Sequence, residues 1–430
     1  MGFDKLKLTK QLVRSANEAG FTAPKEIQQK TLNRIIGGQD VIAIGPEGSG
    51  KTTTYVLSTL NRFNYAPDGV PKVLILVPEK EQVEAVIAQF DLLNKNKSIS
   101  IVGLYVTPGT EAQMDALADG ADIVVATPDR ARTIYLKLGL NLNKVDLLII
   151  DDADLHIKKG MQLPIAELAN SIDKCQHLVF TDVLHPRIEK LIEPFMRQPA
   201  TVEVEESSET PLITHPQILY HVPNFGTKQN LLNLFMQDDE LFTQTAVIVN
   251  SRNNAEKIYK SLNRRIQEEV AYLNGWDYQL KSFTSVDEFK ADEKARVLII
   301  TNEDNAEVDL TGIPFIIHFD LPEEKETFIN RIINHQPDSD EETLAITFAT
   351  DMELSLIKKI EQATGKISVG ALPDELVIEK DATVKKAAKQ AKTESAPTGG
   401  AAFHEKKASN AKTYNISSSK KAKMNKKKNH

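Results

Sequence analysis

The stretch Gly45-Pro46-Glu47-Gly48-Ser49-Gly50-Lys51-Thr52 decides the fold expected for this chain. It fits the pattern G-x-x-x-x-G-K-[ST], in which glycines let the backbone curl so that its N–H groups point at a phosphate. The Lys51 ammonium then reaches the β- and γ-phosphates, and the Thr52 hydroxyl holds Mg²⁺. We call residues 45–52 the phosphate loop and predict that they bind a nucleotide.

The sequence on either side of the phosphate loop has the pattern that this motif requires. Asp40 to Ile44 is typical of a buried strand. Thr52 to Leu60 is typical of a helix, whose N-terminus adds the positive end of its dipole to the phosphate site. The alternative is a chance match in a surface loop, which a strand before it and a helix after it disfavour.

Apolar, β-branched runs alternate with helical patterns along the chain, which predicts parallel sheets covered by helices on both faces. The runs lie at residues 73–77, 99–106, 123–126, 147–150 and 178–180, and again at 246–249, 297–300, 315–319 and 344–348. The polar stretch from Thr201 to Pro211 is the expected linker. We therefore predict two α/β lobes, residues 1–205 and 206–372, with the phosphate loop in the first, and a tail over residues 373–430.

The composition is ordinary for a soluble protein, with 41% hydrophobic and 26% charged residues in 430. That length is too great for a single core. No apolar run is long enough to span a bilayer, and Met1 to Lys7 lacks the apolar core of a signal peptide. Cys175 is the single cysteine, which excludes an internal disulfide and a multi-cysteine metal site. We expect a cytoplasmic protein with no membrane contact.

Charge is distributed unevenly. The chain has a net charge of −8, yet Asp381 to His430 holds 13 Lys against 3 acidic residues. This end is poor in large apolar residues, so we expect it to be disordered. A lysine-rich arm binds polyanions through counterion release, which points to RNA or to an acidic partner. The alternative is that the tail only keeps the protein soluble.

A second acidic motif follows the apolar run at residues 147–150. Asp151-Asp152-Ala153-Asp154 puts carboxylates at the carboxyl end of a buried strand, where a Mg²⁺-dependent nucleotide site needs them. Asp151 is the predicted metal ligand, and Asp152 is the predicted group that orients or deprotonates water. The alternative is an acidic strand-to-loop turn, because Asp is common in turns.

Taken together, these motifs resemble those of the DEAD-box RNA helicase family over roughly residues 1–350. Asp151 to Asp154 stands where that family has Asp-Glu-Ala-Asp. The further matching segments are Gly20 to Gln28, Thr127-Pro128-Asp129-Arg130, Asp309, and Phe319-Asp320-Leu321-Pro322.

The resemblance implies two RecA-like lobes that close around ATP, Mg²⁺ and single-stranded RNA. Gln28 would bond the adenine edge with Phe21 supporting it, and Asp309 would contact the ribose. The phosphate loop and Thr53 would hold the phosphates. RNA contacts would come from Lys80, Thr127 and Arg130.

The departures from the family pattern concentrate in the second lobe. The final motif, His-Arg-x-Gly-Arg-x-Gly-Arg, appears as Asn330 to Pro337, so Arg331 is kept while Asn334 and Pro337 replace two arginines that reach the γ-phosphate. An arginine finger is worth about 10³–10⁵ in rate in related enzymes. Asp152 is shorter than the family's Glu, and a misplacement of about 1 Å can cost on the order of 10²-fold. Both changes predict slow hydrolysis.

Other departures weaken the link between ATP and RNA. Thr181-Asp182-Val183 stands where the family has Ser-Ala-Thr, and a lysine, Lys80, stands where a guanidinium binds the RNA backbone. The Ala-Arg-Gly-x-Asp motif that ends at Asp309 lacks its arginine. Candidate substitutes in the second lobe are Arg252, Arg264, Arg265 and Arg296.

Three hypotheses follow. The first is a divergent ATP-dependent RNA helicase that retains hydrolysis. The second is an ATP-gated RNA-binding or scaffold protein without significant turnover. The third is a P-loop ATPase that acts on a protein partner.

Overall fold

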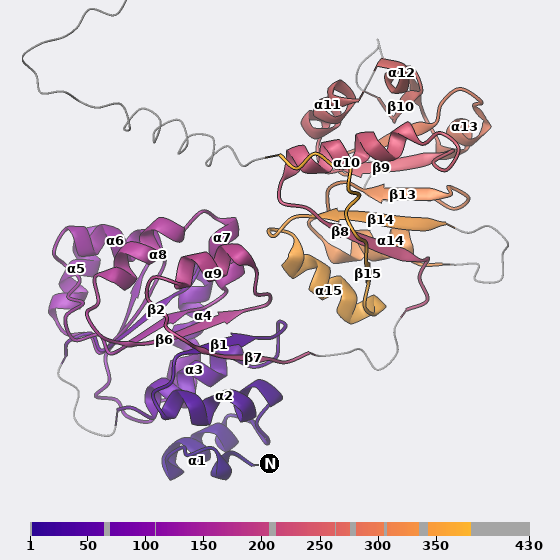
Figure 1. Cartoon of the computed structure of the whole chain (residues 1–430). Coiled ribbons are helices and arrows are strands. Elements are labelled where there is room, and N and C mark those ends of the chain that lie inside the picture. The colour runs from indigo at the N-terminus through magenta and orange to yellow at the C-terminus, as the bar shows by residue number, and fades with distance from the viewer. Residues whose placement is uncertain are drawn as a thin grey trace, which may run out of the picture. The chain divides into compact units, whose positions relative to one another are not determined.

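The computed structural model describes residues 2–63, 69–107, 109–205, 212–262, 264–275, 281–304, 308–334 and 343–379. These residues form two α/β lobes, each built on its own sheet (Figure 1). Every strand pairing within the two sheets is parallel. The predicted fold class is thus confirmed.

The sheet of the first lobe has the strand order β3-β4-β2-β5-β6-β1-β7. Its central strands are short apolar runs with every residue buried, as expected for a parallel sheet covered on both faces. The strands are β1 (Val41–Ile44), β2 (Val73–Leu76), β3 (Ile101–Leu104), β4 (Ile123–Ala126), β5 (Leu147–Ile150), β6 (Gln176–Thr181) and β7 (Ala200–Glu203).

Helices cover both faces of this sheet and bury two separate cores. Apolar residues of α1 to α4 pack on one face, and those of α5 to α9 pack on the other. The elements are η1 (Phe3–Lys5), α1 (Lys10–Glu18), α2 (Glu26–Ile36), α3 (Lys51–Leu60), α4 (Lys80–Leu93), α5 (Thr110–Ala118), α6 (Pro128–Leu136), α7 (Ala153–Lys158), α8 (Gln162–Asn170) and α9 (Pro186–Ile192).

The sheet of the second lobe has the order β11-β10-β12-β9-β13-β14-β8-β15. Alternate residues of its strands enter opposite cores, because successive side chains of a strand point to opposite faces. The strands are β8 (Gln217–His221), β9 (Thr245–Val249), β10 (Val270–Leu273), β11 (Ser282–Phe283), β12 (Val297–Thr301), β13 (Phe315–His318), β14 (Leu344–Ala349) and β15 (Ser368–Val369).

Helices of the second lobe divide between the two faces of its sheet. Those from α10 to α12 share a core with one face, and α13, α14 and α15 pack on the other. Their bounds are α10 (Phe225–Gln237), α11 (Arg252–Ser261), α12 (Arg264–Gln267), α13 (Val286–Ala291), α14 (Lys325–Ile332) and α15 (Leu354–Thr364). Among the described residues, no helix combines the length and the apolar character that crossing a membrane requires.

Two predicted boundaries shift. The expected linker from Thr201 begins inside β7, which pairs with β1 and buries Val202, and Val204 directly after β7 is also buried. The second lobe extends beyond residue 372, because Leu372 and Leu376 pack on its core and Asn230 Nδ2 donates to the Val377 carbonyl at 2.7 Å. The rest of the predicted tail, residues 380–430, lies outside the described residues.

A buried ion pair ties three elements of the second lobe together. Lys228 of α10 is 2% exposed, and its Nζ donates to the Phe319 carbonyl and to both Glu353 carboxylate oxygens, each at 2.8 Å. Glu353 precedes α15 and also accepts the Thr350 N–H at 2.8 Å. The pair therefore joins α10, the end of β13 and the start of α15.

We predict that Glu353→Ala lowers the free energy of unfolding by about 2–3 kcal/mol, because it leaves the Lys228 ammonium buried without its carboxylate. Urea unfolding followed by circular dichroism measures the change. Glu375→Ala, which removes an exposed carboxylate from the same lobe, is the control and should change stability by less than about 0.5 kcal/mol. Equal effects of the two substitutions would contradict the structural role of this pair.

Candidate functional site

Three neighbouring strands bring the phosphate loop and the acidic motif together. The order β5-β6-β1 places β6 between the strand that leads to Asp151 and the strand that leads to Gly45. The carboxyl ends of parallel strands lie at one edge of a sheet, where α/β proteins bind their ligands. The Gly45 N–H donates to the Thr181 carbonyl at 3.0 Å, which fixes the start of the loop against the end of β6.

The phosphate loop has backbone geometry that its glycines make possible. Gly48 and Gly50 have φ values of +81° and +97°, in the left-handed region that favours glycine. A Cβ on Gly50 would lie 2.8 Å from Gln28 Nε2. The loop leads directly into α3, so the N-terminus of this helix faces the loop's concave side, as the sequence predicts.

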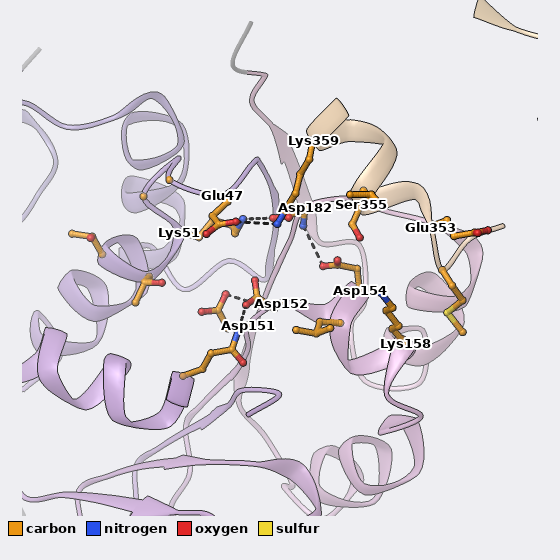
Figure 2. Close-up of a pocket in the computed structure, with 18 of the residues that line it drawn as sticks. Glu47, Lys51, Asp151, Asp152, Asp154, Lys158, Asp182, Glu353, Ser355 and Lys359 are labelled. Atoms are coloured by element: carbon orange, nitrogen blue, oxygen red, sulfur yellow. Dashed lines mark hydrogen bonds and ion pairs between the residues drawn. The ribbon is translucent and has the colours of Figure 1, made fainter. Parts of the chain in front are cut away.

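Lys51 is held inside the protein by three hydrogen bonds. Its Nζ donates to the Gly45 carbonyl at 2.6 Å and to the Pro46 carbonyl at 3.1 Å. It also donates to Asp182 Oδ1 at 2.5 Å (Figure 2). The Lys51 and Asp182 side chains are 9% and 13% exposed. All three ammonium protons therefore have acceptors within the first lobe.

Asp151 lies at the base of the site with both carboxylate oxygens bonded to neutral donors. Oδ2 accepts from the Tyr55 hydroxyl at 2.8 Å, and Oδ1 accepts from the Asp152 N–H at 3.1 Å. Burial raises the pKa of Asp151. Burial, followed by the charge of Asp151, also raises the pKa of Tyr55, which keeps the phenol a hydrogen-bond donor.

Asp152 combines a left-handed backbone with a carboxyl that lies buried beside other acidic groups. Its φ of +50° is left-handed, which Asp tolerates better than most residues. Gln82 Nε2 donates to its Oδ2 at 2.6 Å. Burial, then repulsion from Asp151, raises the pKa of Asp152 to about 8. Near neutral pH this carboxyl therefore carries a proton, so in this state it cannot accept one from water.

The predicted metal site fits Mg²⁺ in part. A buried carboxylate that bonds only to neutral donors gains from a nearby cation, and Asp151 meets this description. Among the described residues, no group of three or more His, Cys, Asp or Glu side chains could hold a metal ion. Mg²⁺ commonly takes one or two protein ligands and completes its shell with phosphate and water. Thr52 and Asp151 are the residues that would hold it.

A cavity of about 1010 Å³ adjoins the phosphate loop. Its lining includes Phe21, Gln28, Lys51, Thr52, Thr53, Asp151, Asp152, Asp154 and Asp182. The structure thus brings together the predicted adenine, phosphate and metal residues. Gln28 Oε1 accepts the Lys25 N–H at 2.9 Å, so this side chain caps the start of α2 beside the loop.

Glu47 gives the phosphate loop an acidic tip. Its Oε2 lies 2.9 Å from Lys359 Nζ on α15, and this hydrogen bond with Lys359 lowers the Glu47 pKa (Figure 2). The Glu47 side chain is 81% exposed. Lys359 therefore brings a cation of the second lobe to the cavity lining.

Other predicted site residues lie away from the cavity lining. Asp309 is exposed on a loop of the second lobe, where its Oδ1 accepts the Thr311 N–H at 2.9 Å. Lys80 begins α4, and Thr127 and Arg130 lie at the start of α6. Since β2 and β4 pair, these two helices begin at neighbouring positions of the same sheet edge as the phosphate loop.

Among the described side chains of the second lobe, the candidate arginines are buried or paired with carboxylates of the same lobe. Arg331 is 6% exposed on α14, and burial lowers its pKa to about 10. Of the candidate substitutes, Arg252 pairs with Asp304 at 2.6 Å, Arg265 pairs with Asp239 at 2.8 Å, and Arg296 pairs with Glu269 at 2.8 Å. Pro337 and the Arg264 side chain lie outside the described part of the chain.

Sequence reasoning did not predict Tyr55, Gln82 or Lys359 as site residues, and it considered Asp182 only as part of a departure from a family motif. Tyr55 lies one helical turn after Lys51, a spacing that could have placed it beneath the loop. Asp182 follows the run at 178–180, which could have indicated a strand end near the other two. No sequence signal marks Lys359.

Comparisons with known proteins agree with this geometry. A sequence model of the DEAD/DEAH box helicase family matches residues 25–191. "ATP-dependent RNA helicase DeaD" of Buchnera aphidicola is 28% identical over 364 residues, which cover 84% of this chain and 59% of that protein. "RNA helicase CrhR" of Synechocystis is 27% identical, with 77% and 66% covered. The chain thus spans about three fifths to two thirds of the length of these relatives.

Solved structures share the fold. The yeast DEAD-box splicing factor Prp28 matches with a TM-score of 0.50 and 21% identity, over 90% of each chain. Identity this low supports the two-lobed fold alone.

Asp152 predicts a pH dependence of stability in the protein without nucleotide. An Asp has a pKa near 4 when unfolded and about 8 here, so folding binds a proton. The resulting destabilisation is absent below about pH 4, grows as pH rises and is complete above about pH 8. Asp152→Asn removes it, since an amide carries no charge and can still accept the hydrogen bond from Gln82.

We therefore expect Asp152→Asn to exceed the wild type in stability by about 2 kcal/mol or more at pH 8, and to differ little at pH 4.5. Calorimetry in EDTA measures both values. Asp91→Asn, on an exposed position of α4, is the matched control. A gain that does not depend on pH would contradict the assignment.

Proposed function

We propose that this chain, which belongs to the DEAD/DEAH box helicase family, binds ATP with Mg²⁺ in its first lobe and binds RNA, with slow hydrolysis and weak unwinding. It matches only part of the length of its curated relatives, so their activity is a proposal for this chain. The observation that carries the proposal is the meeting of the phosphate loop, Asp151 and the end of β6 at one sheet edge.

Several contacts support binding of an adenine nucleotide. The phosphate loop supplies backbone N–H groups and the Lys51 ammonium, while Phe21 and Gln28 line the same cavity. The resemblance to the family implies that Phe21 and Gln28 hold the adenine base. Mg²⁺ would supply charge neutralisation for the phosphates, with Thr52 and Asp151 as its protein ligands.

Slow hydrolysis follows from the groups that would act on the γ-phosphate. Asp152 is one methylene shorter than the family's Glu, which withdraws its carboxyl from the water that it would activate. Arg331 is buried in its own lobe, and Asn334 carries no charge. Lys359 is the second-lobe cation on the cavity lining, although an ammonium lacks the planar fork of an arginine finger.

RNA binding is proposed for the same edge of the first lobe. Lys80, Thr127 and Arg130 begin neighbouring helices, and the Lys80 side chain is 46% exposed. Contacts of this kind read phosphate and sugar rather than bases. The lysine-rich tail would add affinity through counterion release, or would bind an acidic partner.

A cytoplasmic location is part of the proposal. It is supported by the single cysteine of the sequence, which excludes an internal disulfide. Burial raises the pKa of the Cys175 thiol to about 12. Such a thiol stays protonated and unreactive, as in a structural position rather than a redox site.

The second candidate is an ATP-gated RNA-binding or scaffold protein without significant turnover. The burial of Arg331 and the lack of charge at Asn334 favour it. In that case ATP would change RNA affinity while remaining intact.

We predict that Lys51→Ala lowers ATP affinity at least about tenfold, since it removes a charged donor to the phosphates. Equilibrium titration with a fluorescent ATP analogue measures binding, and phosphate release with and without single-stranded RNA measures turnover. Turnover that RNA stimulates and that Lys51→Ala abolishes supports the helicase.

Two other outcomes separate the remaining possibilities. RNA binding that depends on ATP, without phosphate release, supports the scaffold. If neither the wild type nor Lys51→Ala binds nucleotide, the proposal is wrong.

Restoring the missing arginines tests the cause of slow hydrolysis. We expect Asn334→Arg combined with Pro337→Arg to raise RNA-stimulated turnover at least about tenfold, a fraction of the full effect of an arginine finger. Gln237→Arg, which adds an arginine at an exposed position of α10 outside this motif, is the control. No gain would mean that the lobes do not close in the family manner.

A further inference from the structure

The pairing of Lys51 with Asp182 has no counterpart in the motifs that this chain shares with its family. Asp182 stands where the resembling motif, Ser-Ala-Thr, has alanine. Its Oδ1 lies 2.5 Å from Lys51 Nζ, and both side chains are nearly buried. Water screens a buried pair poorly, so this charge strongly affects any ligand of Lys51.

The fold holds this carboxylate in place. Asp182 directly follows β6, which pairs with β1 on one side and β5 on the other. The Thr181 carbonyl accepts the Gly45 N–H at 3.0 Å, and the Thr181 hydroxyl bonds to Asp154 Oδ1 at 2.8 Å. The backbone on the N-terminal side of Asp182 is thereby fixed to both the phosphate loop and the acidic motif.

The three acceptors of Lys51 differ in charge. Two are the backbone carbonyls of Gly45 and Pro46, and the third is the Asp182 carboxylate. A phosphate oxygen can bond to Lys51 only by taking the place of one of them. It would also come close to the Asp182 charge, which repels it.

We propose that Asp182 is an internal competitor for Lys51, and that it weakens the binding of ligands carrying β- and γ-phosphates. This inference rests on the proposed nucleotide-binding function. Asp182 thereby lowers the affinity for ADP and ATP relative to that for adenosine, because adenosine places no phosphate on Lys51. It acts on the ligand through Lys51 and so determines specificity without being a catalytic residue.

The opposite role for Asp182 predicts the opposite result. A carboxylate that only orients Lys51 toward the phosphates would strengthen nucleotide binding, and its loss would weaken it. The sign of the change in affinity therefore separates competition from positioning.

The experiment compares full-length wild type with Asp182→Asn, which keeps the shape of the side chain and removes its charge. Calorimetric titrations in Mg²⁺ use adenosine, ADP, ATP and inorganic tripolyphosphate. A charged hydrogen bond is worth about 1.5–3 kcal/mol, so we expect about tenfold to a hundredfold tighter binding of ADP, ATP and tripolyphosphate. Adenosine affinity should stay the same.

Two matched variants control for charge and folding. Asp91→Asn makes the same change on an exposed position of α4 and should leave every affinity unchanged. Asp182→Glu keeps the charge and should retain weak ADP and ATP binding. If Asp182→Asn does not fold, Asp182→Ala replaces it in the same titrations.

Each remaining outcome is decisive. Unchanged or weaker ADP and ATP binding by Asp182→Asn, with a wild type that binds, would overturn the competitor role and leave the proposed function intact. Tighter adenosine binding by the same factor would also overturn it, because the effect would then arise from the whole pocket. If neither the wild type nor any variant, Lys51→Ala included, binds any of the four ligands, the proposed function itself is wrong.

Discussion

The parallel pairing of β5, β6 and β1 is the constraint on which the candidate site depends. It brings Gly45, Asp151 and Thr181 to one edge of the sheet. The first and last of these residues are more than a hundred positions apart in the chain. All three strands are short and fully buried, and β1 and β5 are apolar throughout, so the strand ends are positioned by the core rather than by solvent-exposed loops. The chemistry of the site is therefore set by whichever residue follows each strand.

The site combines the phosphate loop with a cavity lining that is rich in acidic residues. Glu47, Asp151, Asp152, Asp154 and Asp182 all line the cavity. Burial, followed by the charge of Asp151, raises the pKa of Asp152. Such a site can bind a nucleotide only with effective neutralisation of its phosphates. Mg²⁺ and the lysines that line the cavity, Lys25, Lys51, Lys158 and Lys359, are groups able to provide it.

Local patterns in the sequence predicted much of this structure, because they encode what short segments do. The glycine spacing of the phosphate loop, the apolar runs and the acidic strand end can each be recognised from one short segment of sequence. The contact between Lys51 and Asp182 was not, since it depends on β6 lying between β1 and β5, an order that long-range pairing decides. The burial of Arg331 could not be predicted for the same reason. The strands β11 and β15 could not be predicted either, because they have too few residues to form a recognisable sequence pattern.

The hydrogen bond between Tyr55 and Asp151 has a further consequence for how the site meets its ligand. It links α3, the helix that begins at Lys51, to the end of β5, and the Tyr55 ring also packs 5.3 Å from the Phe180 ring on β6. Helix and strand ends are thus held in one rigid arrangement before any ligand arrives. Ligand binding then needs little ordering of these groups, so less conformational entropy is lost on association than in a site assembled from loops.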